Sequence, residues 1–319
     1  MASAILAGGT QAAALESPEK GIYGMKAKKT ILIIAVSVIG VLLNIFIFYN
    51  LFTPVIGNGG IDFSIGGDNV AVLNIEGIIM AGTPQSYDQS WVINTLDKII
   101  NDNGNRALVL KINTPGGAIY ECDEIYFKLL EYKDTGRPIY AALGKNATSG
   151  GYYIACAADK IFADRNTITG SIGVASGTFI DITGFLEKNG VRIKNVTSGK
   201  NKAMGSLFES FTQEQLDIMQ SIADEAYEQF IDIVATGRGI EADDVRKIAD
   251  GRLLTAKQAL SLKLIDEIAS FNQVRAKIDS LEGMQGLRWK EFKYVPKTSL
   301  WDILLNIKSS APQTGLLEE

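Results

Sequence analysis

The most apolar part of the chain lies near its N-terminus. Residues 31–49 read ILIIAVSVIGVLLNIFIFY, and no charged residue occurs between Lys29 and Asp62. About 20 such residues cross a bilayer core as a helix, which pairs every backbone amide internally. We therefore predict a transmembrane helix over residues 30–50. A cleaved signal peptide is the alternative, but this run is longer than the usual apolar region of roughly 7–15 residues.

Charged and flexible residues flank this apolar segment. Three lysines precede it directly: Lys26, Lys28 and Lys29. The positive-inside rule then predicts a single-pass protein of the cell membrane, with a cytoplasmic N-terminus and the remaining chain on the extracytoplasmic side. We expect residues 1–29 to form a disordered, basic cytoplasmic lead. Residues 51–68 contain Pro54 and five glycines, which is typical of a linker.

After the linker, two kinds of apolar spacing alternate along the chain. Short continuous runs predict buried strands over residues 70–75, 107–112, 138–143, 160–163 and 192–196. Helical spacing predicts helices over residues 91–100, 118–132, 149–158, 241–249, 255–262 and 271–281. A longer helix begins at Thr212, where Gln215 completes a capping-box pattern. Its apolar stripe needs a partner, which we expect to be the sheet or a neighbouring subunit.

Strands that alternate with helices predict an α/β fold with a parallel sheet. We place this domain over residues 69–285. Residues 286–319 form a C-terminal tail, in which residues 299–307 have an amphipathic pattern suited to a membrane surface or a subunit.

Histidine is absent from the sequence. This excludes Ser-His-Asp and Cys-His catalysis, because no imidazole is present to act as base, and it excludes an H-E-x-x-H zinc site. A hydrolase with this sequence must use Lys, Asp or Glu as its base. Cys122 and Cys156 are expected to be buried thiols, with a single disulfide as the alternative. A net charge of −5 and a pI near 5.1 argue against nucleic acid as a partner.

Glycine-rich turns follow three of the predicted strands, at residues 113–117, 148–153 and 169–174. In open α/β folds, ligands bind at the carboxyl ends of the strands. In the second turn, Ser149 lies between a strand and a helix, as the nucleophile does in a nucleophile elbow. Amides of Gly116, Gly117 and Gly150 are candidates for an oxyanion hole. The alternative is that Ser149 only caps a helix and the glycines only form turns.

Without histidine, Ser149 needs another base. A lysine can serve, because desolvation penalises the ammonium form and so lowers the pKa of the amine. Lys200 and Lys202 lie in a loop of small residues after a predicted strand, and spacing alone does not distinguish them.

Together these motifs resemble those of the SppA-type signal peptide peptidases, which are membrane-anchored serine proteases with a Ser/Lys dyad. The similarity covers residues 69–268. It rests on N-T-P-G-G at 113–117, T-S-G-G-Y-Y-I-A at 148–155, T-G-S-I-G-V at 169–174, S-G-K-N-K at 198–202, G-R-G at 237–239, A-D-G-R at 249–252 and L-I-D at 264–266. Their order, the predicted anchor and the missing histidine together make the resemblance specific.

The resemblance implies a role for each candidate residue. Ser149 matches the family's nucleophile, and Lys202, rather than Lys200, matches its general base. Ser171 matches a serine whose hydroxyl orients that lysine. Three glycines match the oxyanion-hole positions: Gly116, Gly117 and Gly150. No metal or organic cofactor is needed. The family usually has an aromatic residue before the lysine and an acidic residue after it, whereas this sequence has Asn201 and Ala203.

The resemblance also implies a fold, an assembly and a substrate. The family fold is ClpP/crotonase-like, built from repeated strand–strand–helix units. Its members form homo-oligomeric rings on the bilayer, in which adjacent protomers supply the two dyad residues. Their substrates are signal peptides left in the membrane after preprotein processing. The alternatives are a ClpP-class protease acting on other membrane proteins, an inactive ring-forming scaffold, or an acyl-CoA enzyme, which the predicted extracytoplasmic location disfavours.

Overall fold

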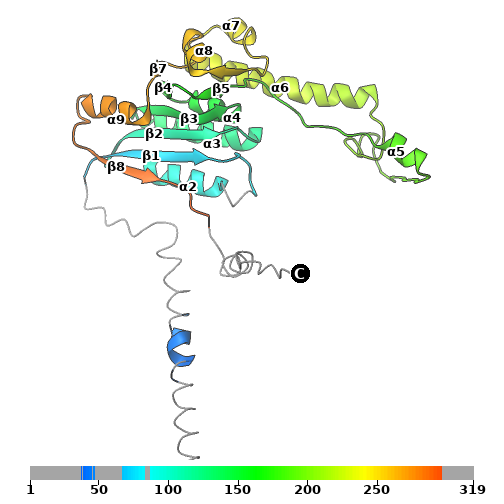
Figure 1. Cartoon of the computed structure of the whole chain (residues 1–319), viewed down its shortest axis with the longest axis horizontal. Coiled ribbons are helices and arrows are strands. Elements are labelled where there is room, and N and C mark those ends of the chain that lie inside the picture. Colours follow the sequence, from blue (N-terminus) through cyan, green and yellow to red (C-terminus); the bar gives the residue numbers. More distant parts are fainter. Residues whose placement is uncertain (1–36, 38, 45, 47–66, 83–86, 297–319) are drawn as a thin grey trace, which may run out of the picture. The chain divides into compact units, whose positions relative to one another are not determined.

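The computed structural model in Figure 1 describes residues 37, 39–44, 46, 67–82 and 87–296. The chain divides into two units, Met1–Ile65 and Gly66–Glu319. In the first unit the described residues are helical, and nearly all of their side chains are exposed. Within the described ranges, no helix is long and apolar enough to cross a membrane. Most of the predicted transmembrane segment and linker, and residues 297–319 of the tail, lie outside these ranges.

Three neighbouring parallel strands form the centre of the second unit: β1 (Asn69–Glu76), β2 (Asn105–Thr114) and β3 (Ile139–Thr148). Two helices connect them: α2 (Gln89–Ile100) and α3 (Ile119–Lys133). Most residues of each strand are buried, because helices or loops cover both faces of the sheet. The predicted α/β fold with a parallel sheet is therefore confirmed.

The sheet divides at β3. The first part of β3 pairs with β4 (Lys160–Ala163), and its last residues pair with β5 (Ile168–Gly170). The strand order is β6-β5-β3-β2-β1-β8, with β4 and β7 on the second branch. The remaining strands are short: β6 (Leu253–Thr255), β7 (Glu267–Ile268) and β8 (Arg288–Phe292). Only β6 is antiparallel to its neighbour among the named strands.

Six further helices complete the described chain: α4 (Gly150–Ala155), α5 (Thr183–Lys188), α6 (Gln213–Arg238), α7 (Ala242–Arg246), α8 (Ala256–Ser261) and α9 (Phe271–Ser280). The larger hydrophobic core lies between the sheet and α2, α3, α4 and the end of α6. A smaller core packs α9 against the other face of the sheet. Thr212 caps α6 and forms the predicted capping box with Gln215.

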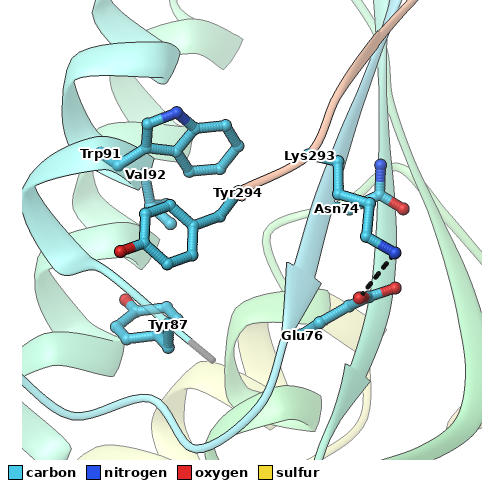
Figure 2. Close-up of a pocket in the computed structure, with 7 residues that line it drawn as sticks. All are labelled: Asn74, Glu76, Tyr87, Trp91, Val92, Lys293 and Tyr294. Carbon is cyan, nitrogen blue, oxygen red and sulfur yellow. Dashed lines mark ion pairs between the residues drawn. The ribbon is translucent and has the colours of Figure 1, made fainter. Parts of the chain in front are cut away.

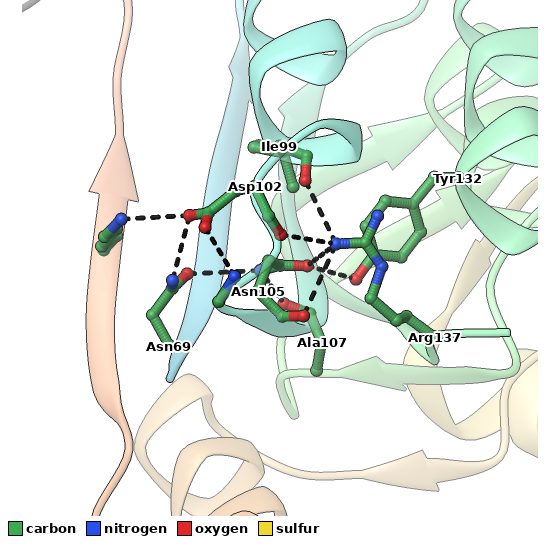
Figure 3. Close-up of polar contacts among 9 residues, drawn as sticks. Asn69, Ile99, Asp102, Asn105, Ala107, Tyr132 and Arg137 are labelled. Carbon is green, nitrogen blue, oxygen red and sulfur yellow. Dashed lines mark hydrogen bonds and ion pairs between the residues drawn. The ribbon is translucent and has the colours of Figure 1, made fainter. Parts of the chain in front are cut away.

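A buried polar cluster, drawn in Figure 3, fixes α2 to the beginning of β2. Arg137 donates to the carbonyl oxygens of Ile100 at 2.7 Å and Asp102 at 3.1 Å, near the end of α2. Its guanidinium lies over the ring of Tyr132 at 4.6 Å, and the Tyr132 hydroxyl donates to Asn105 at 2.7 Å. The cluster satisfies carbonyl groups that the helix end leaves unpaired.

The helices and the longer strands were predicted to within a few residues, whereas other elements were not. The strand expected over residues 192–196 is wrong: this segment is exposed and has no strand partner in the described chain. A strand needs a neighbour to pair its amides, so an apolar run alone does not form one. Four short strands, β5 to β8, and α5 were not predicted, because their few residues carry little periodic signal.

Candidate active site

Ser149 lies at the carboxyl end of β3, directly before α4. Its backbone has φ 52° and ψ −122°, a conformation that residues with a side chain rarely adopt. Its amide donates to the carbonyl oxygen of Gly170 at 2.9 Å, while its side chain makes no capping hydrogen bond to α4. The capping role considered for this serine is therefore not what the structure shows. A strained turn that leaves the hydroxyl uncommitted is typical of a nucleophile elbow.

The three predicted oxyanion-hole glycines lie against this serine. Gly116 has φ +100°, and a methyl group on it would come within 2.7 Å of the Gly150 amide nitrogen and 2.9 Å of Ser149 Cβ. A methyl group on Gly150 would lie 3.2 Å from the Gly117 nitrogen. Because no side chain separates these residues, their backbones come within contact distance of one another.

The backbone amides of these three glycines differ in whether they already donate a hydrogen bond. Gly116 donates to the hydroxyl of Thr114 at 3.0 Å, so its amide is already paired. The amides of Gly117 and Gly150 donate to no other residue that the structure describes. The Gly150 amide is also at the first position of α4, where no intrahelical acceptor exists. Gly117 and Gly150 are therefore the two donors available to a developing oxyanion, and Gly116 shapes the turn that presents them.

Ser171 lies beside Ser149 at the end of the neighbouring strand. β3 and β5 pair in parallel, with Thr148 opposite Gly170, so each serine is the next residue of its strand. Ser171 also has a positive φ, 51°, and its amide donates to the carbonyl oxygen of Arg252 at 2.8 Å. Neighbouring strands are about 4.8 Å apart, so the two serines lie side by side at the same edge of the sheet.

Lys202 lies elsewhere in the chain, on a segment that we call the arm, residues 173–212. The arm runs from the end of β5 to the start of α6, and Figure 1 shows α5 beside the far end of α6. Between Ile172 and Phe230 no residue is buried. Lys202 itself is exposed. The structure therefore brings Ser149, Ser171 and the glycines together, but it does not bring Lys202 to them within one chain.

The arm is held together by contacts of its own. The Ile182 amide donates to the carbonyl oxygen of Leu207 at 3.1 Å, and the rings of Phe179 and Phe211 lie 5.0 Å apart. Lys200 forms an ion pair with Glu214 in the first turn of α6. The loop that contains both lysines is thus attached to the start of α6.

The remaining sequence motifs fix the elements around the site. The Gly251 amide donates to Ile172 at 3.0 Å, so the A-D-G-R segment pairs with the residues after Ser171. Arg238 of G-R-G forms an ion pair with Asp266 of L-I-D at 3.1 Å. The same carboxylate accepts from the Ile161 amide at 2.7 Å, which joins the end of α6 to β4.

One residue of the site was missed by sequence reasoning. Ile79 follows β1 and pairs in parallel with Gly117: its amide donates to Gly116 at 3.0 Å, and its carbonyl oxygen accepts from Ala118 at 2.8 Å. This short bridge holds the glycine turn in place. A single apolar residue after Gly77 gave no periodic signal that could have identified it.

The two cysteines take no part in nucleophilic chemistry. Both are buried free thiols, as expected. Burial raises the pKa of Cys122 and of Cys156 to about 12, which keeps them protonated at neutral pH. A methyl group on Gly150 would lie 2.3 Å from Cys122 Sγ, so this thiol packs directly beneath the turn.

A small hollow lies at the carboxyl ends of β1 and β8, shown in Figure 2. Trp91 and Tyr294 form one wall, with ring centroids 5.7 Å apart. The ion pair between Lys293 and Glu76, at 3.1 Å, forms the other. None of the predicted site residues lines this hollow.

Comparison with known proteins identifies related peptidases. The model of "Peptidase family S49" matches residues 131–285. A putative signal peptide peptidase SppA of Enterococcus faecium is 37% identical over 62% of this chain and 59% of its own length. A putative protease of Synechocystis is 34% identical over 67% of this chain and 75% of its own length. Protease 4 of Haemophilus influenzae is 33% identical over 67% of this chain and 35% of its own length.

The chain therefore belongs to peptidase family S49, and the resemblance to SppA-type peptidases is confirmed. It spans only part of the Enterococcus and Haemophilus relatives. Among solved structures, a mutant of ClpP1 from Listeria monocytogenes is similar to it, with a TM-score of 0.44 and 16% identity, over 63% of this chain and 92% of that one.

Proposed function

We propose that this protein is a serine endopeptidase in which Ser149 is the nucleophile and Lys202 the general base. One observation carries the proposal. Ser149 lies on a strained turn, its side chain makes no capping hydrogen bond to α4, and the unpaired amides of Gly117 and Gly150 lie beside it. When Ser149 attacks a peptide carbonyl carbon, negative charge develops on the carbonyl oxygen, which these two amides can stabilise.

The proposed reaction uses these residues in turn. Lys202 in its neutral form takes the proton from Ser149, whose oxygen then attacks the peptide carbonyl. The amides of Gly117 and Gly150 stabilise the tetrahedral oxyanion, and the bond to the leaving amine breaks to give an acyl-enzyme. The protonated lysine returns its proton to the amine and then activates the water that hydrolyses the ester. Ser171, beside Ser149, orients the lysine.

The base comes from a neighbouring copy of the chain, because the arm does not reach the site of its own chain. The arm carries large apolar side chains that are more than a third exposed, which is typical of an interaction surface. They are Ile180, Phe185, Val191, Ile193, Val196, Leu207 and Phe208. A second copy that covers them would exclude water from Lys202, as its role as base requires. Head-to-tail contacts of this kind form a ring when the rotation between neighbouring copies closes.

The sequence and the relatives support a proposal for the substrate and the location. The apolar segment over residues 31–49 and the lysines before it support a membrane anchor with the peptidase domain on the extracytoplasmic side. The Enterococcus relative is named a putative signal peptide peptidase. We infer that the substrates are signal peptides left in the membrane.

Turnover of a synthetic signal peptide by the detergent-solubilised full chain tests the chemistry. We expect S149A and K202A each to lose activity by about 10³-fold or more, as removal of a nucleophile or base does in other peptidases. K200A is the matched control and should keep most of the activity. Loss in K200A with retention in K202A would reverse the assignment of the base, and full activity in S149A would indicate a scaffold.

Co-expression of the two inactive variants tests the shared site. In a random ring, each site takes Ser149 from one copy and Lys202 from the next, so about a quarter of the sites regain both residues. We therefore expect the S149A and K202A mixture to recover activity. If both residues came from one chain, the mixture would remain inactive.

A further inference from the structure

Three helices that carry parts of the site meet at one buried tyrosine. Tyr153 of α4 is 4% exposed. Its hydroxyl donates to Asp123 of α3 at 2.5 Å and accepts from the side chain of Gln229 of α6 at 2.6 Å. Its ring contacts Tyr126 and Phe230, with centroids 5.7 Å and 5.1 Å away. A single side chain thus links α3, α4 and α6.

Each of these helices is attached to a different part of the site. α4 begins directly after Ser149, and α3 begins two residues after the Gly116–Gly117 turn. α6 carries the arm at its N-terminal end, where the arm runs directly into the helix and the side chain of Asn201, next to Lys202, donates to Glu214 at 3.3 Å. Any change in the angle between α4 and α6 therefore changes where the arm presents its lysine.

α6 contacts α4 at two points along its length. At the inner point, Gly237 approaches so closely that a methyl group on it would lie 2.3 Å from the carbonyl oxygen of Cys156. At the outer point, Gln229 and Phe230 contact Tyr153. Two points separated by about 12 Å, at ~1.5 Å per residue, define the direction of a helix.

Beyond the outer point α6 extends without buried residues. The buried residues of this helix are Phe230, Ile231 and Val234, all at its C-terminal end. From Gln229 to Thr212 the helix is a lever of roughly 25 Å, so a tilt of about 3° moves its start by about 1 Å. Misplacement of a catalytic group by ~1 Å can reduce a rate by about 10²-fold.

The polar contacts of Tyr153 are stable at neutral pH. Burial, and then the hydrogen bond to Asp123, hold the pKa of Tyr153 well above its usual range. The hydroxyl therefore remains a donor to the Asp123 carboxylate while it accepts from Gln229, so it makes one hydrogen bond as donor and one as acceptor.

We propose that Tyr153 is a positioning residue: its hydroxyl, held between Asp123 and Gln229, sets the direction of α6 relative to α4 and thereby the position of Lys202. This rests on the proposed function, because Lys202 must act in the site of a neighbouring copy. Tyr153 touches no reacting atom. It acts through the helix that presents the base.

The Y153F variant keeps the ring and removes the hydroxyl. We expect kcat for the signal peptide to fall by about 10-fold with KM unchanged, because the base is misplaced while substrate binding is intact. Y126F is the matched control: it loses a hydroxyl that bonds no described residue, on a ring that contacts Tyr153. Equal kcat values in Y153F and Y126F would overturn the proposal.

Variants of the two hydrogen-bond partners separate positioning from folding. D123N keeps an acceptor for the tyrosine and should retain most of the activity, whereas D123A should lose it as Y153F does. Q229A removes the donor from an exposed position of α6 and serves if Y153F does not fold. A Q229A enzyme with normal kcat, or a D123N enzyme as slow as D123A, would contradict the role assigned to the network.

Mixed rings show through which copy Tyr153 acts. In rings of S149A with K202A, every active site takes its arm from the S149A chain. Adding Y153F to that chain should lower the recovered activity by about 10-fold, as misplacement of the base predicts. Adding Y153F to the K202A chain, which supplies Ser149, should leave the recovered activity unchanged.

A loss confined to the mixture with Y153F on the K202A chain would mean that Tyr153 acts on the nucleophile, and equal losses in the two mixtures would mean that it acts on both halves of the site; either result overturns the proposal. No loss in either mixture overturns it as well. Failure of the proposed function has a different signature: the S149A and K202A mixture itself would remain inactive, and the positioning role would fail with it.

Discussion

At the scale of single residues, the site depends on backbone conformations that side chains disfavour. Ser149 and Ser171 both have φ near +50°, at equivalent positions of neighbouring strands. Such conformations cost about 1–3 kcal/mol each and persist only where the surrounding structure enforces them. Here Gly170, Arg252 and the glycine turn supply the enforcing contacts, so strain and function coincide.

Gly116 provides a test of this close packing. In G116A, a methyl group meets the Gly150 nitrogen at 2.7 Å on a backbone with φ +100°. We expect a loss of roughly 2–4 kcal/mol in the free energy of unfolding, because steric overlap adds to the backbone strain, together with loss of peptidase activity. Urea unfolding and the peptide assay measure the two effects.

Gly136 is the matched control for this variant. It has φ +76°, yet a methyl group on it would meet no heavy atom within 4 Å. G136A should therefore cost only the backbone strain, about 1 kcal/mol, and leave activity intact. If G116A lost no more stability and no more activity than G136A, the packing of Gly116 against the serine turn would contribute to neither.

The cysteines give a second prediction at this scale. With pKa values of about 12 and buried side chains, Cys122 and Cys156 have almost no thiolate at pH 8. We expect iodoacetamide to leave the folded enzyme unlabelled and fully active, and to label both residues after unfolding in urea. Rapid alkylation of Cys122 with loss of activity would show that the turn opens in the native state.

At the scale of elements, the longer motifs join the ends of helices to the sheet. Gly237 permits the close contact between α6 and the end of α4, and Arg238 pairs with Asp266 beside β4. The side chain of Arg238 is 7% exposed and that of Asp266 is 22% exposed, so this pair is well shielded from solvent. Removing one partner of such a pair leaves the other buried without compensation.

The contacts of Asp266 with Arg238 and with the Ile161 amide predict that the stability of the fold depends on pH. Burial opposes ionisation of Asp266, but hydrogen bonds from the Ile161 amide and from Arg238 together hold its pKa below the usual value. A lowered pKa contributes stability above the unfolded-state value near 4, and this contribution disappears as the pH falls through the folded-state value. We expect D266N to be less stable than the wild type by about 2 kcal/mol at pH 7, and the difference to shrink below pH 4.

Unfolding by urea at several pH values checks this. D244N is a control, because Asp244 is an exposed carboxylate paired with Lys247 on the surface of α7, and its loss should change stability little. A D266N difference that stayed constant from pH 7 to pH 3 would show that the carboxylate charge is not the source of the stability.

At the scale of the whole molecule, one chain contains the proposed nucleophile site and a separate, unburied arm. The exposed apolar side chains of the arm are not covered within one chain, since none of residues 173–229 is buried. The proposed ring gives them a partner and completes the site at the same time. Assembly and activity should therefore be lost together.

Val196 tests this link, because it is 92% exposed in the single chain. We expect V196D to keep its fold, as no contact within the chain is lost, but to dissociate and to lose activity by about 10-fold or more as the site loses its base. Size-exclusion chromatography in detergent and the peptide assay measure the two effects.

Val295 is the control for this variant, as an exposed apolar residue outside the arm, at 70% exposure. V295D should change neither assembly nor activity. A V196D enzyme that remained assembled and active would remove the arm from the interface.

The sequence determined much of this protein by itself. Periodicity located the main strands and helices, because burial on one face or both follows directly from apolar spacing. The missing histidine implies a lysine, aspartate or glutamate as the base of a hydrolase, and the glycine turns predict Ser149 as nucleophile with oxyanion donors beside it. These are local features, so short stretches of sequence are sufficient to reveal them.

Only the tertiary structure decided which of these features meet. It paired β3 with β5 and so placed Ser171 beside Ser149. It also showed that the Gly116 amide already donates a hydrogen bond to the hydroxyl of Thr114. It left residues 192–196 without a strand partner and Lys202 far along an unburied arm. It also joined α3, α4 and α6 at Tyr153. Pairing of distant segments depends on the packing of the whole chain, and therefore no local pattern of residues encodes it.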